Sequence, residues 1–277
     1  MSFHCRSAIL LFCLPLLAAQ ERKLRVCADA NNLPFSNEAG EGIENRLAEL
    51  LAHDMHAQVE YTWWAERKSF LKNSLGAGLC DVVMGVPPEL DTVSATRPYY
   101  TSTYVFVERQ DRGLKIASLN DPRLEQLRIG IHLVGENYAP PAHLLATRGI
   151  ARQLIGYRLI GSVGEANPPA RLIEAVAHGD VDVGIVWGPF AGYFAKRQDA
   201  PLAITPVTPS AFRDIPFTYG IAVAVRKGDN ALRTEIETVM ARNCKKIDAL
   251  VSEFGIPKAR EDSASCDVSQ PSVASSH

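Results

Sequence analysis

The stretch LRVCADANNLPFSN, from Leu24 to Asn37, is the part of the sequence from which the fold can first be inferred. Its opening residues, Leu24 to Ala28, form a short apolar run that is typical of a buried strand. Asn31, Asn32 and Phe35 follow in a polar turn that contains no glycine. Because α/β proteins bind ligands where such strands end, we expect a ligand site beside this turn.

Downstream of this stretch, helices and strands are predicted to alternate. The apolar periodicity predicts an amphipathic helix over Gly42–Ala57, a strand over Val59–Trp63 and a second helix over Ala65–Leu75. Cys80–Val86 is a continuous apolar strand of the kind that is covered on both faces. This order predicts right-handed crossovers and a mostly parallel sheet, so the fold class is α/β.

A related pattern returns later in the chain and predicts a second lobe. Leu172, Ile173 and Val176 share a helix face that Gly179 ends, and Asp182–Trp187 is the next strand. The spacing Gly-x-x-Asp-Val occurs at Gly78 and again at Gly179. A helix ended by glycine and followed by a buried strand is common in α/β proteins, so the repeat only suggests two lobes of similar build.

Two strands are predicted to cross between the lobes, Thr103–Val107 and a return crossing near Phe217–Val225. We therefore expect a discontinuous first lobe, residues 20–108 and 218–277, and a second lobe, residues 109–217, whose sheet opens at Leu127–Ile131. Helices over Ala231–Asn243 and Lys245–Phe254 end the fold. The tail after about residue 259 has few apolar side chains and is expected to be disordered unless Cys266 anchors it.

Residues 1–19 have the pattern of a signal peptide. His4 and Arg6 precede an apolar run, Ala8–Leu17, and the small residues Ala18 and Ala19 follow it. The run is too short to span a bilayer, so a membrane anchor is the less favoured alternative. We expect export and cleavage near Ala19, which leaves a mature protein without a membrane span.

Four cysteines remain after this cleavage, Cys27, Cys80, Cys244 and Cys266, and they can pair in three ways. If Cys27 and Cys80 lie on neighbouring parallel strands, we expect them at different heights and farther apart than the ~7 Å between Cα atoms that a disulfide tolerates. The connectivity therefore stays open. The spacings match no zinc ribbon or Cys-x-x-Cys redox site, and we expect no metal and no cofactor.

The composition limits the classes of partner. The chain has 277 residues, an apolar fraction of 47% and a formal net charge of −2. It provides no basic field for nucleic acid or an anionic membrane, and no acidic block that would indicate a cationic substrate. Partners are therefore expected to be recognised locally, and nucleic acid is not among them.

Several long motifs resemble one family in the correct order and over essentially the whole mature chain. Besides the opening stretch, they are VEYTWWAERKSFLKNSL from Val59, CDVVMGVP from Cys80, ATRPYYTSTYVFV from Ala95, WGPFAGYFA from Trp187 and FTYGIAVAVRKGD from Phe217. They resemble the binding proteins associated with quinoprotein dehydrogenases, within the second structural type of the periplasmic solute-binding protein superfamily. Members of that group are similar to the J-type accessory protein that accompanies methanol dehydrogenase.

The resemblance implies a periplasmic, monomeric protein of two lobes joined by a two-strand hinge. It also implies a non-enzymatic accessory of a PQQ-dependent alcohol (methanol) dehydrogenase, with that dehydrogenase or its maturation intermediate as partner. The alternative is the solute receptor of an ABC transporter. A fold and its usual company do not by themselves establish a biochemical role, so both functions stay open.

Amino-acid receptors of this fold hold the α-carboxylate with an arginine and the α-ammonium with an aspartate. By the family resemblance, the arginine position falls near Glu89 and the aspartate position falls at Trp187. Because a buried unpaired charge costs several kcal/mol, these replacements argue against an amino-acid ligand in the usual pose. Any small ligand is therefore expected to be something other than an amino acid.

The predicted cleft is instead rich in aromatic and amide side chains. It would take either a flat organic molecule stacked between rings or a segment of a protein. Trp63 and Tyr104 are better explained as core residues, and Arg67 and Lys68 as solvated helix residues. The candidate cleft residues are Asn31, Asn32, Phe35, Trp64, Glu89, Tyr99, Tyr100, His132, Glu136, Tyr138 and Trp187.

Catalysis has little support in the sequence. There is no Gly-x-Ser-x-Gly elbow, no His-Glu-x-x-His and no phosphate-binding glycine loop. His132 and Glu136 would be the acid–base pair of an enzyme such as a dehydratase, but no nucleophile accompanies them. Asp29, Glu89 and Asp91 are a weak candidate for a hard cation. We therefore expect no enzymatic activity.

Overall fold

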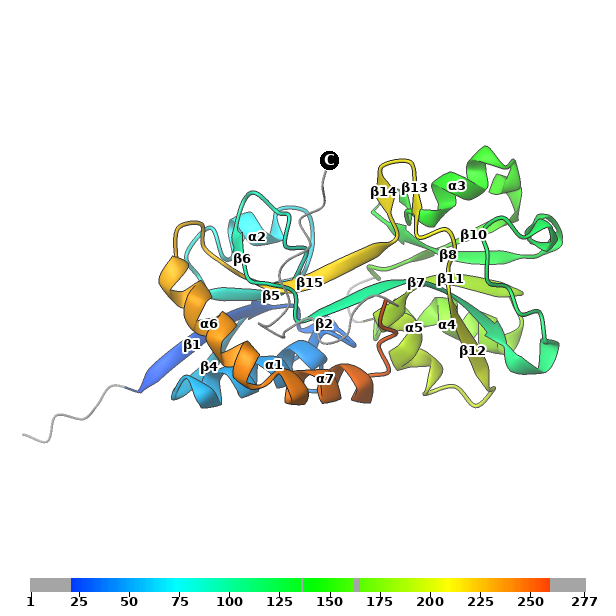
Figure 1. The fold of residues 1–277 in the computed structure, drawn as a ribbon. Helices are drawn as coiled ribbons and strands as arrows, with labels where there is room; N and C mark the ends of the chain where they lie inside the picture. The colour runs from blue at the N-terminus through cyan, green and yellow to red at the C-terminus, as the bar shows by residue number, and fades with distance from the viewer. Residues whose placement is uncertain (1–20, 136, 162–164, 260–277) are drawn as a thin grey trace, which may run out of the picture.

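The computed structural model describes residues 21–135, 137–161 and 165–259. Within these residues one sheet of 11 strands runs through both lobes, and its main path has the order β10-β8-β11-β7-β15-β5-β1-β4 (Figure 1). Helices cover both faces of the sheet. The prediction of a two-lobe α/β fold is confirmed, whereas the signal peptide, Glu136, Cys266 and the tail lie outside the described residues.

The first lobe contains a parallel sheet of three strands. β1 lies between β4 and β5 and is parallel to both. The short strands β2 and β3 pair in the turn that follows β1, and β6 pairs with β15 at the edge. The bounds are β1 (Arg22–Ala28), β2 (Asn31–Asn32), β3 (Ser36–Asn37), α1 (Ile43–Asp54), β4 (Ala57–Trp63), α2 (Phe70–Asn73), β5 (Val82–Val86) and β6 (Ser94–Ala95).

The second lobe repeats this plan, with β8 between β10 and β11 and parallel to both. β12 pairs with β7, β9 with β8, and β13 with β14. The bounds are β8 (Ile129–Val134), β9 (Asn137–Tyr138), α3 (Pro141–Thr147), β10 (Leu154–Arg158), α4 (Ala170–His178), β11 (Val183–Trp187), α5 (Gly188–Ala195), β12 (Leu202–Pro206), β13 (Ala211–Phe212) and β14 (Ile215–Pro216), with 3-10 turns at Gln110–Arg112, Pro122–Gln126 and Ile150–Gln153.

Two long strands, β7 (Tyr100–Arg109) and β15 (Thr218–Val225), cross between the lobes as predicted. They pair antiparallel from Thr218 opposite Thr103 to Ile221 opposite Tyr100. β15 also pairs with β5 of the first lobe, and β7 pairs with β11 of the second. The two sheets are therefore joined into one, while the lobe boundaries at residues 108 and 218 stay a prediction.

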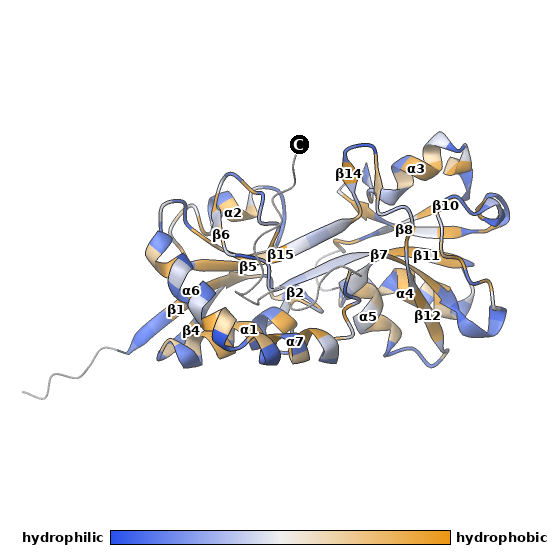
Figure 2. Cartoon of the chain, in the orientation of Figure 1, coloured by the Kyte–Doolittle hydropathy of each residue, from blue (hydrophilic) through white to orange (hydrophobic). Residues whose placement is uncertain are grey.

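The chain then returns to the first lobe as α6 (Asn230–Arg242) and α7 (Cys244–Glu253), which lie beside α1 on one face of the sheet (Figure 1). Apolar residues of these helices, among them Ile236, Val239 and Val251, belong to the core, and hydrophilic residues alternate with them along the helices (Figure 2). The segment after α7 packs on α5 of the second lobe so closely that a Cβ on Gly192 would lie 1.8 Å from the carbonyl oxygen of Gly255. This contact adds to the strand pair that connects the lobes.

The other face of the first lobe has a much thinner cover. The helix predicted over Ala65–Leu75 is only α2, four residues long. Ser69, directly before it, has a φ of 73° in the left-handed region, which a right-handed helix cannot continue through. Residues 64–69 are therefore an irregular segment, and the prediction of a long helix is wrong.

The Gly-x-x-Asp-Val repeat has a structural explanation. Asp81, before β5, accepts a hydrogen bond of 2.6 Å from Arg25 of β1, and Asp182, before β11, accepts one of 3.0 Å from Arg128 ahead of β8. In both lobes the same arginine also donates to the carbonyl of the glycine three residues before the aspartate. The repeat therefore fixes the start of one strand to its parallel neighbour, once in each lobe.

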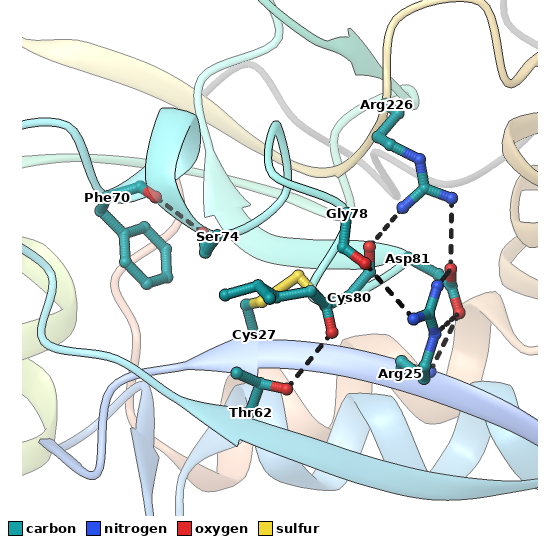
Figure 3. Close-up of a disulfide and its surroundings, with 10 residues drawn as sticks. Arg25, Cys27, Thr62, Phe70, Ser74, Gly78, Cys80, Asp81 and Arg226 are labelled. Carbon is teal, nitrogen blue, oxygen red and sulfur yellow. Dashed lines mark hydrogen bonds and ion pairs between the residues drawn. A yellow bond between two sulfur atoms is a disulfide. The ribbon is translucent and has the colours of Figure 1, made fainter.

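A disulfide joins Cys27 to Cys80, with 5.6 Å between the Cα atoms (Figure 3). The expectation that these residues are too far apart is wrong. It assumed that Cys80 lies in a strand, but β5 begins at Val82, and the N–H of Asp81 donates to the carbonyl of Arg25 at 2.8 Å, which holds Cys80 beside Cys27. Cys244 is disulfide-bonded as well.

We predict that removing the Cys27–Cys80 bond by a double substitution to alanine lowers the free energy of unfolding by about 3–4 kcal/mol. The reason is that the bond closes a loop across 53 positions of the sequence and so restricts the unfolded chain. Urea unfolding in oxidising buffer measures the difference. In buffer with excess dithiothreitol the two proteins should become nearly equal, and a persistent large difference would mean that packing is responsible.

Candidate functional site

A cavity of about 440 Å³ lies between the two lobes. Its walls come from segments that follow β1 and β4 in the first lobe and β8 and β10 in the second, together with the start of α4 and part of α5. These are the carboxyl ends of parallel strands, where α/β proteins bind ligands. The cavity is the candidate functional site.

The wall from the first lobe is polar and is organised by Asp29. One carboxylate oxygen of Asp29 accepts a hydrogen bond of 2.9 Å from the backbone N–H of Asn31, and the other accepts one of 2.7 Å from the N–H of Glu66. The amide of Asn32 donates to the Glu66 carboxylate at 2.8 Å. Asp29 therefore holds the loop after β1 against the loop after β4.

Glu66 is the titratable group of this wall. Burial and the nearby negative charge of Asp29 raise its pKa to about 7, although the hydrogen bond from Asn32 favours the charged form. Behind it, burial and the proximity of Glu66 raise the pKa of Glu44, whose carboxylate occupies the space where a Cβ on Gly85 would lie. Glu66 of the polar wall therefore changes its protonation state near neutral pH.

The wall from the second lobe is almost entirely apolar. It contains Leu159, Ile160 and Phe190 together with Val134, Gly135, Gly161 and two prolines. Phe190 meets Phe35 of the first lobe edge to face, with 5.2 Å between ring centroids. The side chain of Asn31 also donates to the carbonyl of Glu165 across the cleft at 2.8 Å. The two lobes are thus in contact around the cavity.

Large apolar side chains remain exposed around this cavity. Val134 and Ile160 of the second lobe line it and are 51% and 49% exposed. Trp64 of the first lobe precedes the wall residue Ala65 and is 43% exposed. We call these three residues the apolar mouth. Exposed apolar side chains that lie beside one cavity are candidates for a binding surface.

The structure brings some of the predicted cleft residues together. Asn31, Asn32 and Phe35 all line the cavity. Trp64 lies beside it, in the apolar mouth. Tyr138 is exposed on β9 and is not part of the cavity lining. Glu136 lies outside the described residues.

Four other predicted residues do not line the cavity. Tyr99 and Tyr100 are each 2% exposed and belong to the core, where their rings pack edge to face with 5.0 Å between centroids. Trp187 is half-buried between the rings of Tyr104 and Tyr219, at centroid distances of 5.4 and 5.8 Å. Glu89 is exposed away from the cavity.

His132 does not line the cavity either, and it is a buried structural residue. It is 1% exposed, its Nε2 lies 3.2 Å from the carbonyl oxygen of Pro169, and its ring packs edge-on against Phe190. Burial lowers its pKa to about 4, and Nδ1 has no hydrogen-bond partner among the described residues. The neutral ring therefore supports the apolar wall from behind.

Sequence reasoning missed two charged residues of the wall. Glu66 was placed inside a predicted helix, and Arg67 was interpreted as a solvated residue of that helix, although it lines the cavity. Both follow β4 by a few residues. Their position after the carboxyl end of a strand that neighbours β1 was the signal that could have identified them.

Among the residues that the structure describes, no group of three or more His, Cys, Asp or Glu side chains is arranged to hold a metal ion. None of the helices in the same residues is long and apolar enough to cross a membrane.

Two curated proteins are similar to this chain over most of its length. Protein MoxJ of Methylorubrum extorquens AM1 is 32% identical over 246 residues, which cover 84% of this chain and 81% of that protein. Protein MoxJ of Paracoccus denitrificans is 31% identical over 258 residues, covering 86% of this chain and 90% of that protein. No family model matches the chain.

Solved structures agree with these relatives. MxaJ from Methylophaga aminisulfidivorans MPT superimposes with a TM-score of 0.74 at 28% identity, covering 85% of this chain and 100% of that one. The periplasmic binding protein XoxJ from Methylobacterium extorquens AM1 gives 0.71 at 29% identity, covering 86% and 100%. An ancestral cationic amino acid solute-binding protein, at 22% identity and a TM-score of 0.66, shares the fold.

We predict that His132→Gln makes the protein less sensitive to acid. Between pH 6.5 and about 4 the unfolded chain binds a proton on this histidine and the folded protein does not, so wild-type stability falls as pH falls. Glutamine keeps a donor for the Pro169 carbonyl and does not titrate. The variant should avoid about 2–3 kcal/mol of this loss, measured by urea unfolding from pH 7 to pH 4. Parallel curves for the two proteins would contradict a neutral, buried His132.

We predict the opposite pH trend for Glu66. Its folded pKa of about 7 exceeds the ordinary value of 4.5, so the folded protein holds a proton that the unfolded chain releases, and stability falls as pH rises between these values. Glu66→Gln should remove this dependence and raise the free energy of unfolding at pH 8 by about 1–2 kcal/mol, with little change at pH 5. Exposed Glu60→Gln is the control, and an equal effect there would overturn the assignment.

Proposed function

The chain belongs to the MoxJ family of periplasmic binding proteins, and on that premise we propose that it is a non-enzymatic accessory of a PQQ-dependent alcohol (methanol) dehydrogenase. In this proposal the interlobe cleft binds the dehydrogenase, or a partly folded intermediate of it, and assists its activation. The protein acts in the periplasm as a monomer, after cleavage near Ala19, and carries no cofactor of its own.

The observation that carries this proposal is the apolar mouth. A receptor for a small solute needs apolar groups inside its cavity, but it does not need Trp64, Val134 and Ile160 to stay about half exposed at the entrance. These side chains come from both lobes, so a partner that covers them would contact both at once. Trp is also a typical anchor of protein interfaces. A protein segment therefore fits this surface better than a free solute.

The cavity behind the apolar mouth has room for only a small part of a partner protein. Its volume of about 440 Å³ is at the small end of the range for ligand pockets, and it would take a few side chains of a partner. Its apolar wall offers burial to such side chains, and the Asp29–Glu66 wall offers hydrogen bonds. A longer segment would require the lobes to separate, breaking the Phe35–Phe190 and Asn31–Glu165 contacts.

The described lining of the cavity does not resemble a clamp for an α-amino acid at the positions that such receptors use. Glu89 and Trp187 both lie outside the lining. Both oxygens of Asp29 accept hydrogen bonds from the protein's own backbone. Catalysis by His132 has no support in the geometry either, because the ring is buried and neutral behind the wall. A binding role without chemistry accounts for both observations.

We predict that Val134→Asp with Ile160→Asp weakens capture of the dehydrogenase from periplasm by at least about tenfold, because the charges must be desolvated on binding. Leu79→Asp with Leu90→Asp is the matched control, since these leucines are also exposed but lie away from the cavity. A pull-down followed by an activity assay of the captured dehydrogenase measures both effects. Absence of association and of any effect on dehydrogenase activity would refute the proposal.

The second candidate is a solute receptor of an ABC transporter, for a small ligand other than an amino acid. It is favoured by one observation, namely that the two lobes already meet around a cavity of ligand size. Thermal-shift screening against alcohols, quinones, metals and amino acids separates the two candidates. A true ligand at ~100 times its Kd should add about 2.7 kcal/mol of stability, and such a hit would favour transport.

A further inference from the structure

A second concave surface lies outside the interlobe cleft, on the thinly covered face of the first lobe. It is a groove of about 690 Å³ between the segment that carries α2, the loop before β6 and the residues that follow β15. We call it the basic groove. Its apolar floor is formed by Phe70, Leu71 and Val93, and its rim carries the cations Arg67, Lys72 and Lys227, with Arg226 beside them.

The floor is accessible because the sheet is incompletely covered here. On the opposite face α1, α6 and α7 lie side by side, whereas this face has only the four residues of α2 and two loops. The small core beneath surrounds the Cys27–Cys80 disulfide, which Figure 3 shows beside Phe70. Its other members are Leu75, Val83, Val86, Ala222 and Ala224. Leu71 and Val93 pack on this core and remain only partly buried.

The rim has an excess of positive charge. Within the described residues, neither Arg67 nor Lys72 forms an ion pair, and Lys227 donates only to the uncharged carbonyl of Asp91, at 2.9 Å. Arg226 is different, because it contacts Asp81 at 3.3 Å (Figure 3). No carboxylate is among the described residues that line the groove. Three cations thus surround an apolar floor on a chain whose net charge is −2.

We propose that the basic groove binds an acidic segment of a partner polypeptide, with apolar side chains of that segment on its floor. Charge complementarity selects carboxylates for the rim, and the exposed floor selects apolar groups between them. The lining thus combines cations with apolar side chains, which fits a peptide that carries both carboxylates and apolar groups. This inference does not depend on what occupies the interlobe cleft.

The position of Arg67 gives the groove a connection to that cleft. Arg67 lines both the basic groove and the interlobe cavity, and the residue before it, Glu66, is held by Asp29. The irregular segment 64–69 therefore has one side toward each site. A chain bound in the groove would contact the same segment that supplies part of the cleft wall.

The test uses the full mature chain and a fluorescein-labelled peptide composed of Glu, Asp, Leu and Phe. We expect saturable binding that weakens as NaCl is raised, since salt screens exposed charge pairs. Lys72→Glu with Lys227→Glu should weaken binding by at least about tenfold, because each change replaces attraction by repulsion at a side chain that does not line the interlobe cavity. The same peptide with Lys in place of its acidic residues should not bind.

The matched control is Lys68→Glu with Lys245→Glu. These lysines are exposed and make the same change in net charge, but neither lines the groove. Binding should change by less than about twofold in this variant and in the Val134→Asp, Ile160→Asp variant of the cleft mouth. Because all four rim and control side chains are exposed, thermal unfolding should show that every variant is folded.

Three outcomes would overturn the inference. The first is absence of saturable peptide binding by the wild-type protein. The second is an equal loss of binding in the groove variant and in the matched control, which would indicate a general charge effect. The third is binding of phosphatidylglycerol vesicles, but not of the peptide, with loss in the groove variant, which would identify a lipid surface as the occupant.

Discussion

The antiparallel pairing of β7 with β15 is the interaction on which the rest of this structure depends. Four residue pairs, from Thr103–Thr218 to Tyr100–Ile221, join the two lobes into one sheet. Each strand then continues into a different lobe, so the pairing sets how the carboxyl ends of β1 and β4 face those of β8 and β10. The close approach of Gly192 to Gly255 adds a second connection beside it. The position of the cleft follows from these two contacts rather than from any cleft residue.

One wall of the cleft is polar and the other is apolar, because each is built around a different kind of contact. Asp29 uses both carboxylate oxygens to join two loops of the first lobe, and this concentrates polar groups there. The opposing wall is built on Phe190 with the neutral ring of His132 behind it. A guest would therefore meet hydrogen-bonding groups on one side and apolar surface on the other. The exposed Trp64, Val134 and Ile160 extend the apolar surface beyond the cavity.

The thinly covered face of the first lobe differs from the opposite face in how it is stabilised. Three helices cover one side of the sheet, whereas the other side is covered by a four-residue helix and is linked by a disulfide. The disulfide restricts the unfolded chain where few apolar contacts are available to hold the folded one. The same scarcity of cover leaves Leu71 and Val93 accessible beside Arg67, Lys72 and Lys227, which form no ion pair with any residue that the structure describes. The sparse cover of this face thus explains both why the disulfide is important for its stability and why the basic groove is accessible.

The sequence by itself determined the α/β class, the alternation of elements and the crossing strands, because apolar periodicity and glycine stops are local signals. It also placed Asn31, Asn32 and Phe35 at a strand end. Only the tertiary structure decided that Tyr99 and Tyr100 are core, that Glu66 and Arg67 line the cleft, and that Cys27 reaches Cys80. Each of these depends on contacts between residues that are far apart in the sequence. A left-handed residue such as Ser69 redirects the chain without changing the apolar pattern, so the apolar pattern does not predict such contacts.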